Sequence, residues 1–398
     1  MTQPSRSPIT VRLTRYFFVL FPGVFLVLAG AWSAFQMEEH GHVITGMNNQ
    51  VVWGLPHVFA IFLIVSASGI LNVASMGSVF GQPVYKARAP LSGLLAIAML
   101  AAGLSVLMLD LGRPDRVVLA ATTYNVTSVF AWNVLLYSGL FATVLMYLWT
   151  LLDRTMGKWT KPAGILVFVW RFILTSGTGL IFAFLVARQA YGSALLPPMF
   201  IVMSFAWGMS VFLLVQSGVL WWHHLPLEPA ILKRMKNLLA LFVLAVLYLV
   251  AIYHMTNLYF SRQAAFERFI LLDGGTATLS FWLGYVLLGT LLPIVLLLTP
   301  LSARVCNVLM ASFFVLIGAF SFLYTFIVGG QEFPLLVFTG YKVHSSFGDG
   351  MIASYTPSLY EWLLGLGGLG VAFVITVIGL GLFNFLPRDV VEKASVSG

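Results

Sequence analysis

The sequence predicts an all-α integral membrane protein with about ten transmembrane helices. Its composition is the first reason, because 60% of the 398 residues are hydrophobic and only 9% are charged, whereas soluble domains average about 25% charged residues. The second reason is that apolar runs of about 20 residues, the length needed to cross a bilayer, recur along the whole chain. The third is that most charges lie between these runs. The net charge of +8 therefore indicates membrane orientation rather than nucleic-acid binding.

Ten apolar runs define the expected helices. Their approximate limits are 17–35, 55–80, 91–110, 128–150, 164–187, 198–222, 237–258, 278–299, 305–328 and 359–385. A basic segment precedes the first run, and no small-residue cleavage site follows it, so we expect a start-transfer helix that stays in the protein. The chain is expected to form a single transmembrane domain over residues 1–398.

The basic residues predict the orientation of this domain. Ten crossings place both termini on one side, and 14 of the 21 Lys and Arg residues lie on that side. The opposite side has six: Arg113, Arg116, Arg188, Arg262, Arg268 and Lys342. Because cytoplasmic connections carry the excess of basic residues, we expect both termini in the cytoplasm and the domain in a bacterial inner membrane. The longer outer connections, roughly 36–54, 111–127, 259–277 and 329–358, would then face the periplasm.

An internal repeat is visible in the third and seventh helices. The segment "LLAIAMLAAGLSVLMLD" (94–110) aligns without gaps with "LLALFVLAVLYLVAIYH" (238–254), which places Asp110 opposite His254. Shorter matches follow in the same order in neighbouring helices. We therefore expect two four-helix units, helices 2–5 (54–188) and helices 6–9 (198–328), with one flanking helix at each end of the chain. An even number of crossings per unit makes the repeat parallel.

Polar residues gather at the outer ends of several helices. His57 begins the second helix, Asp110 ends the third, and Asn133 and Tyr137 lie one turn apart in the fourth. An imidazole, a carboxylate, an amide and a phenol at one depth could bind the carbonyl oxygens of a quinone. Oxidation of a quinol releases two protons, and His and Asp are suited to accept them.

Structural roles are the alternative for each of these residues. Asp110 could form an ion pair with Arg113 one turn further on and anchor the helix end. His57 could be an interfacial histidine whose hydrogen bonds are satisfied, and Tyr137 could belong to the aromatic belt at the membrane surface.

Two further polar stripes lie within the membrane, one that runs inward from the outer end of the second helix and one at the cytoplasmic end of the fifth helix. One lies on a face of the second helix and comprises His57, Ser68, Asn72 and Ser75. The other lies on the fifth helix, where Arg171, Thr175 and Thr178 share a face. Together with His254, this second stripe is a candidate proton path. Small polar residues often serve helix packing instead, but a charge within a span, such as Arg171, is a functional candidate by default.

The cysteine and histidine content limits the cofactors. The single cysteine, Cys306, excludes a disulfide framework and a cluster held by four thiolates within this chain. Each four-helix unit has one histidine within its spans, so we expect neither haem nor a metal site. Two other classes stay open: a secondary transporter, which internal repeats and a polar cluster would suit, and a b-type cytochrome subunit with His57 and His254 as axial ligands.

Three segments resemble a known family. "VVWGLPHVFAIFLIVSASG" (51–69), "LDLGRPDR" (109–116) and "TSVFAWNVLLYSG" (127–139) resemble the NrfD/PsrC-like family, the membrane subunits of polysulfide reductases and related respiratory oxidoreductases. The resemblance spans helices 2–9. Within the family, the stretch that begins "HGHVITGMNNQ" at residue 40 is most similar to the DsrP branch, from the DsrMKJOP complexes of sulfur-metabolising bacteria.

The resemblance implies a haem-free subunit that exchanges electrons between a quinone pool, of menaquinone or ubiquinone, and a periplasmic ferredoxin-like iron–sulfur subunit. Further membrane and cytochrome subunits are implied as partners, and whether this chain is itself catalytic stays open. Family members hold the quinone near the outer surface with a histidine on the first core helix and a tyrosine on a later one. By position, His57 matches the histidine and Tyr137 or Tyr124 the tyrosine, while Asp110 matches the family's acidic residue.

Overall fold

The computed structural model describes residues 13–335, 350–383 and 385. Within these residues the chain is helical and has ten helices long and apolar enough to cross a membrane, which confirms the prediction of an all-α membrane protein. Single helices make eight of the crossings: α1 (Leu13–His40), α2 (Leu55–Ser78), α4 (Ala89–Leu109), α6 (Val129–Leu152), α7 (Thr160–Ala183), α8 (Leu196–Trp222), α9 (Pro229–Tyr259) and α15 (Leu359–Leu382). The other two are composite: α11 (Thr276–Leu279), η5 (Ser280–Leu291) and α12 (Leu292–Leu298) form the eighth, and α13 (Val305–Tyr324), η7 (Thr325–Gly329) and α14 (Gly330–Glu332) form the ninth.

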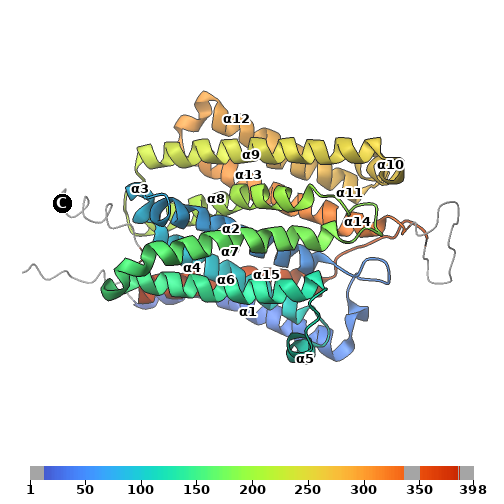
Figure 1. Ribbon diagram of the computed structural model, residues 1–398, viewed down its shortest axis with the longest axis horizontal. Coiled ribbons are helices and arrows are strands. Elements are labelled where there is room, and N and C mark those ends of the chain that lie inside the picture. The colour runs from blue at the N-terminus through green and yellow to red at the C-terminus, as the bar shows by residue number, and fades with distance from the viewer. Residues whose placement is uncertain (1–12, 336–349, 384, 386–398) are drawn as a thin grey trace, which may run out of the picture.

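The crossing helices run side by side in one elongated bundle (Figure 1). The beginning of α1 and the end of α15 lie at the same end of it, on the left of Figure 1, which we call the near end. The opposite end is the far end. Residues 1–12 and 386–398, and 336–349 of the outer connection expected at 329–358, lie outside the described residues.

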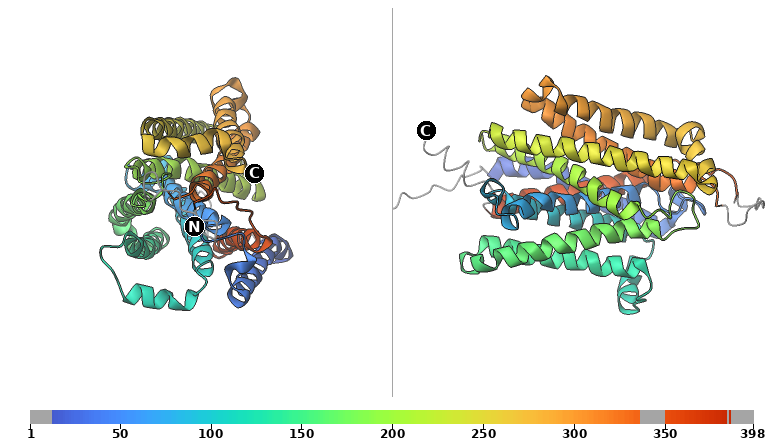
Figure 2. Two further views of the ribbon diagram at one scale, coloured as in Figure 1. Left: turned by 90° about the vertical axis from the view of Figure 1, so that its right-hand side faces the viewer. Right: turned by 45° about the horizontal axis from the view of Figure 1, so that its top comes forward.

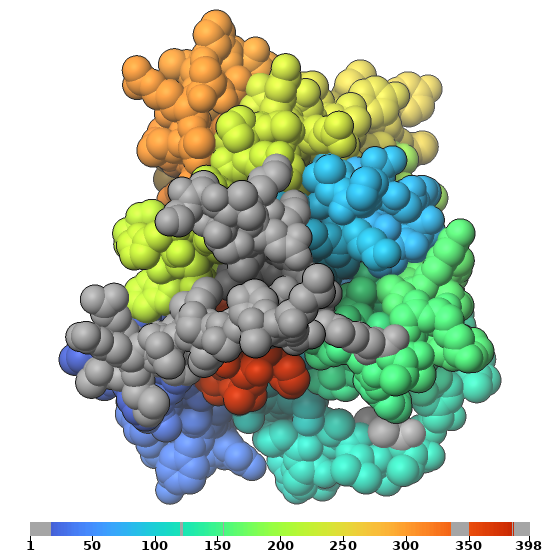
Figure 3. All heavy atoms as spheres, turned by 90° about the vertical axis from the view of Figure 1, so that its left-hand side faces the viewer, coloured from blue at the N-terminus to red at the C-terminus, as the bar shows by residue number. Residues whose placement is uncertain are grey.

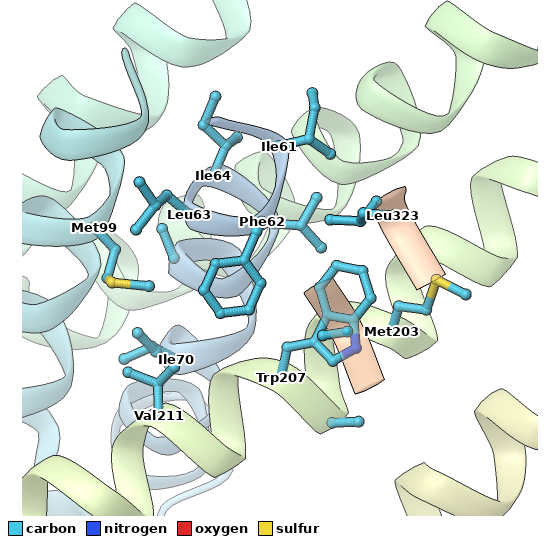
Figure 4. Packing of buried hydrophobic residues seen from close by; sticks show 14 of the residues in the cluster. Ile61, Phe62, Leu63, Ile64, Ile70, Met99, Met203, Trp207, Val211 and Leu323 are labelled. Carbon is cyan, nitrogen blue, oxygen red and sulfur yellow. The ribbon is translucent and has the colours of Figure 1, made fainter. Parts of the chain in front are cut away.

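Helix α2 occupies the centre of the bundle. Its most apolar 18-residue window is entirely buried, and it packs against α4, α7, α8, α13 and α15. Figure 4 shows Phe62 and Leu63 of α2 between Met99 of α4 and Trp207 of α8, and the ring centroids of Phe62 and Trp207 lie 6.2 Å apart. Because lipid is as apolar as these side chains, close packing rather than escape from water holds such helices together.

Two helices flank the four-helix units, and they pair with each other. Helix α1 packs along α15, which in turn packs against α4 and α2; the end-on view in Figure 2 shows α1 and α15 side by side at the edge of the bundle. Their crossing is tight, because a Cβ on Gly30 would lie 2.8 Å from the Cα of Gly367.

The helix contacts of the two expected units correspond to each other. Helix α2 packs against α4 and α7, and α8 packs against α9 and α13 in the same way. Likewise α6 packs along α7, and η5 packs along α13. This correspondence supports the expected parallel repeat, which we retain as a prediction.

The connections contain short helices that hydrophobic periodicity does not predict. They are η1 (His42–Ile44), α3 (Pro83–Lys86), η2 (Pro114–Arg116), α5 (Val117–Thr122), η3 (Arg154–Trp159), α10 (Ser261–Arg268), η4 (Phe269–Asp273) and η6 (Pro300–Ala303). At the near end (Figure 3), α3 and the start of α9 border a cavity of about 500 Å³ whose lining includes Tyr85 and Arg234.

Candidate functional site

The far end brings together the histidine and the aspartate that the sequence predicted as a pair. Pro56 lies in the first turn of α2, where its missing N–H costs nothing, and His57 follows it. Helix α4 ends at Asp110, and Gly112 adopts a φ of +68° just beyond it, a conformation that favours glycine. Since α2 and α4 pack along each other in opposite directions, His57 Nδ1 lies 2.7 Å from Asp110 Oδ2.

Asp110 is buried, and its partner is not an arginine. Its side chain is 1% exposed. Arg113 forms an ion pair with Asp115 instead, at 3.1 Å between exposed side chains, and the Arg113 guanidinium lowers the pKa of that carboxyl. The alternative in which Asp110 pairs with Arg113 is therefore wrong, because the chain turns at Gly112 and carries Arg113 towards the surface.

A second histidine lies on the other side of Asp110. His42, in η1, places Nε2 at 3.0 Å from the Asp110 backbone oxygen and 3.9 Å from Oδ1. Gly112 makes this approach feasible, since a Cβ there would lie 2.9 Å from the His42 ring. The sequence analysis missed His42 because it lies in a connection without periodicity; the only signal was its place in the "HGHVITG" stretch.

An aromatic wall stands beside His57. The Trp53 ring stacks on the imidazole with centroids 5.8 Å apart, and it also contacts the rings of Phe130 and Phe182. Trp53 is held from the ninth crossing, because Gln331 of α14 accepts its backbone N–H at 3.0 Å and donates to its carbonyl at 2.9 Å. The ninth crossing therefore also shapes the surroundings of His57.

The segment before α2 is held by buried polar contacts as well. Arg188 donates to the carbonyl oxygens of Gln50 at 2.9 Å and Gln331 at 3.2 Å, and burial lowers the pKa of this arginine. Glu361 has a related structural role: its carboxylate accepts hydrogen bonds from the Gly46 and Ser358 N–H groups and from the Tyr355 hydroxyl.

The other predicted quinone ligands have different neighbours. Asn133 donates to the carbonyl oxygens of Val129, at 2.9 Å, and Gly177, at 3.2 Å, and so joins α6 to α7. Tyr137 is buried, and Thr178 of α7 donates to the Leu174 carbonyl oxygen at 3.1 Å. Tyr124 is half-buried in the connection between α5 and α6. Their contribution to a quinone site stays a prediction.

The two expected polar stripes meet in the interior. Ser68 of α2 and Thr175 of α7 are joined by a hydrogen bond of 2.6 Å, and Arg171 donates to the Ser68 carbonyl at 3.2 Å. The Arg171 guanidinium also lies over the Phe172 ring, 4.7 Å from its centroid. The arginine is thus surrounded by backbone oxygen and aromatic faces at the α2–α7 contact.

His254 has a carboxylate partner that the sequence analysis did not identify. Its Nδ1 lies 2.6 Å from Glu267 Oε2, and Asn257 donates to Oε1 at 2.8 Å. Glu267 lies on α10, just before the π-helical turn η4, and its side chain is fully buried. Both carboxylate oxygens of Glu267 therefore have aligned partners.

The Asp110 cluster differs from the Glu267 cluster in the hydrogen bonding of its carboxylate oxygens. Asp110 Oδ1 and Oδ2 and His57 Nδ1 are buried, yet within the described residues none has a partner in hydrogen-bonding alignment, despite the short distance between the two side chains. Asn133 Oδ1 is buried and lacks such a partner in the same part of the chain. Buried polar atoms are normally satisfied, so this donor and acceptor set fits a ligand with polar oxygens, such as the head group of a quinone.

The fold and this site define a multi-pass integral membrane protein with a buried, incompletely satisfied acid–base cluster at one end. Residues 43–335 match the family described as polysulphide reductase, NrfD, and the chain belongs to this family.

Three curated relatives match over most of their length. The Hdr-like menaquinol oxidoreductase integral membrane subunit of Archaeoglobus fulgidus is 30% identical, over 89% of this chain and 90% of its own. A putative membrane subunit of the dimethyl sulfoxide reductase of Halobacterium salinarum is 29% identical, over 90% and 88%. A subunit of the selenate reductase of Mesobacillus selenatarsenatis is 23% identical, over 93% and 94%.

Proposed function

We propose that this chain is the quinone-reacting membrane subunit of a respiratory oxidoreductase complex. The observation that carries the proposal is the buried contact between His57 and Asp110, at 2.7 Å, whose polar atoms lack aligned hydrogen-bond partners among the described residues. The names of the relatives support it, since they describe membrane subunits of a menaquinol oxidoreductase and a dimethyl sulfoxide reductase. Menaquinone is therefore the first quinone to test, with ubiquinone as the other candidate.

The residues of the site have distinct roles in this proposal. A bound quinol supplies two electrons and two protons. His57, which is 16% exposed beside a fully buried carboxylate, is placed to take up a proton, and Asp110 stabilises the resulting imidazolium by its negative charge. The Trp53 ring, stacked on His57, offers a flat apolar wall for a head group. For quinone reduction the same groups deliver protons in the opposite direction.

The electrons need a partner, which we place at the far end. A periplasmic ferredoxin-like iron–sulfur subunit would dock there, beside further membrane and cytochrome subunits. The resemblance to the DsrP branch, whose complexes serve sulfur metabolism, implies these partners. The support is the position of the His57–Asp110 site at that end and the length of the connections around it, since long connections often form binding surfaces.

Substitution of the two central residues tests the proposal. We expect Asp110→Asn and His57→Ala to lower quinol-dependent turnover of the assembled complex by roughly 10²-fold or more, the usual range for loss of an acid–base group. Asp115→Asn is the matched control, because Asp115 is exposed and lies in the same segment; its turnover should be unchanged. Normal turnover in both Asp110→Asn and His57→Ala would show that the reaction takes place elsewhere.

A further inference from the structure

We propose that His42 carries protons between Asp110 and the water outside the far end. This proposal rests on the proposed quinone reaction and adds the exit route for its protons. A buried acid–base pair can turn over repeatedly only if each proton that it accepts can leave again, so a connection to solvent is a physical requirement of the site.

Of the three side chains of the cluster, that of His42 is the most exposed, which makes it the outlet to solvent. The Asp110 side chain is 1% exposed, that of His57 is 16% exposed, and that of His42 is 33% exposed. His42 also lines a cavity of about 180 Å³ together with Glu38 of α1 and Gly112 and Pro114 of the segment after α4. Such a volume is large enough for several water molecules, so the outward side of the imidazole has room for an exchange partner.

The His254–Glu267 pair is a useful comparison for the Asp110 cluster, because it has no second histidine beside its carboxylate. Glu267 has His254 on one oxygen and Asn257 on the other, and an amide cannot carry a proton. The second neighbour of Asp110 is His42, whose imidazole can carry a proton. Among the described residues Asp110 Oδ1 also lacks an aligned partner, and it lies 3.9 Å from His42 Nε2, so a small rotation of either side chain would join them.

The transfer can be written atom by atom. After His57 has taken up a proton, it passes its Nδ1 proton to Asp110 Oδ2, 2.7 Å away, and rotation of the carboxyl group turns the new O–H bond towards His42. The proton then moves to Nε2 of a neutral His42 that carries its hydrogen on Nδ1, which breaks the O–H bond, forms the N–H bond and leaves the carboxylate. The resulting imidazolium donates its Nε2–H to the Asp110 backbone oxygen, 3.0 Å away, and releases the Nδ1 proton to water. Rotation or tautomer exchange of the neutral ring then restores the starting state.

The charged groups around His42 favour this direction. Asp110 faces the ring from α4, and Glu38 faces the same cavity from α1. Arg113 lies close enough to Glu38 to interact with it electrostatically but has Asp115 as its ion-pair partner. An imidazolium at His42 thus has the Asp110 carboxylate beside it and a second acidic side chain, Glu38, on the same cavity.

Chemical rescue provides the test, in the assembled complex at low buffer concentration. We expect His42→Ala to lower kcat for quinol oxidation at least tenfold with KM unchanged, and imidazole in the outer medium to restore much of the rate. His42→Gln keeps a donor for the Asp110 carbonyl but cannot relay a proton, so it should be slow and should not respond to imidazole. His40→Ala is the matched control, because His40 is exposed and its described hydrogen bond lies within α1; it should behave as the unmodified protein.

The outcomes separate the two proposals. If Asp110→Asn is inactive while His42→Ala turns over normally, the quinone site stands and the relay through His42 is wrong. If His42→Ala is slow without rescue and His42→Gln is normal, His42 only holds the end of α4 by its hydrogen bond, which also overturns the relay. If Asp110→Asn is fully active, the relay fails, and if His57→Ala is fully active as well, the proposed reaction fails with it.

Discussion

Asp110 has two histidine neighbours and, among the described residues, no arginine or lysine in ion-pair contact, and this decides what it can do. An arginine partner would hold the carboxylate ionised, as Arg113 does for Asp115. A histidine partner can instead exchange a proton with it near neutral pH. The contact with His57 at 2.7 Å therefore favours acid–base chemistry over simple anchoring of the helix end.

Arg171 is the other residue whose role a substitution can decide. Its guanidinium is buried at the α2–α7 contact, over aromatic rings and beside the Ser68 carbonyl. If it belongs to a proton path, Arg171→Gln should leave quinol turnover in detergent near normal and abolish proton translocation by the complex in liposomes. Arg171→Lys, which keeps the charge but not the planar stacking, is the control for charge.

Loss of stability alone would point to a packing role for Arg171. Stacking of a buried cation on an aromatic face contributes about 2 kcal/mol, so a packing role predicts a lower melting temperature for Arg171→Gln with proton translocation intact. That outcome would remove Arg171 from the proposed proton path.

The residues that could be predicted from the sequence are those within periodic helices. His57, Asp110 and the Ser68–Arg171 stripes stand out because a polar side chain in an apolar run is conspicuous. His42 and Gln331 could not be predicted, because their roles depend on which connection folds over which helix end. Glu267 lies in an outer connection where hydropathy gives no sign of burial, yet it is fully buried against His254.

At the scale of elements, α2 and α8, the first helices of the two predicted four-helix units, meet through a close crossing of their backbones. Helices α2 and α8 approach so closely that a Cβ on Gly208 would overlap the Gly69 carbonyl carbon, and one on Gly69 would overlap the Ser204 oxygen. The η5–α13 contact has a similar pair, Gly289 and Gly318. Small residues of this kind let membrane helices approach each other closely.

The close crossing of α2 and α8 predicts that replacing a single glycine there lowers the stability of the protein. Gly208→Val should force α2 and α8 apart and lower the melting temperature of the detergent-solubilised protein, because overpacking typically costs about 1–3 kcal/mol and the neighbour here is rigid backbone. Gly218→Val on the same helix is the control, since a Cβ there meets nothing within 4 Å among the described residues. Equal melting temperatures for the two variants would show that the close approach of α2 and α8 does not contribute to stability.

The positions of the helices could be predicted from the sequence, whereas the segments that are π-helical rather than α-helical could not. All ten spans match the expected runs to within several residues, because length and hydropathy determine a crossing. The π-helical segments η4, η5 and η7 all lie in the second unit. Hydropathy does not distinguish a π-helical from an α-helical crossing, so these segments had no signal in the sequence.

The whole molecule has two chemically different ends. At the near end, the described basic residues include Lys86 of α3 and Lys233 and Arg234 in the first turns of α9, whereas the acid–base cluster lies at the far end. Positive residues stay preferentially on the cytoplasmic side of a membrane. The arrangement therefore favours a cytoplasmic near end and a periplasmic far end, where protons and the partner subunit would meet.

Thiol labelling tests this orientation and the docking face together. Cys306 is exposed at the near-end start of α13, and Ile352 is exposed in the connection that leads to α15 at the far end. With a membrane-impermeant maleimide added to intact cells, Cys306 should stay unlabelled until the membrane is opened.

The docking face is tested in a Cys306→Ser background. Ile352→Cys should be labelled from outside when the subunit is expressed without its partners. Its labelling should be at least several-fold slower in the assembled complex, because an apolar exposed side chain there suits a protein contact. Labelling of Cys306 from outside would show that the inferred orientation is wrong. Equal labelling rates for Ile352→Cys with and without partners would show that the partner does not dock on this connection.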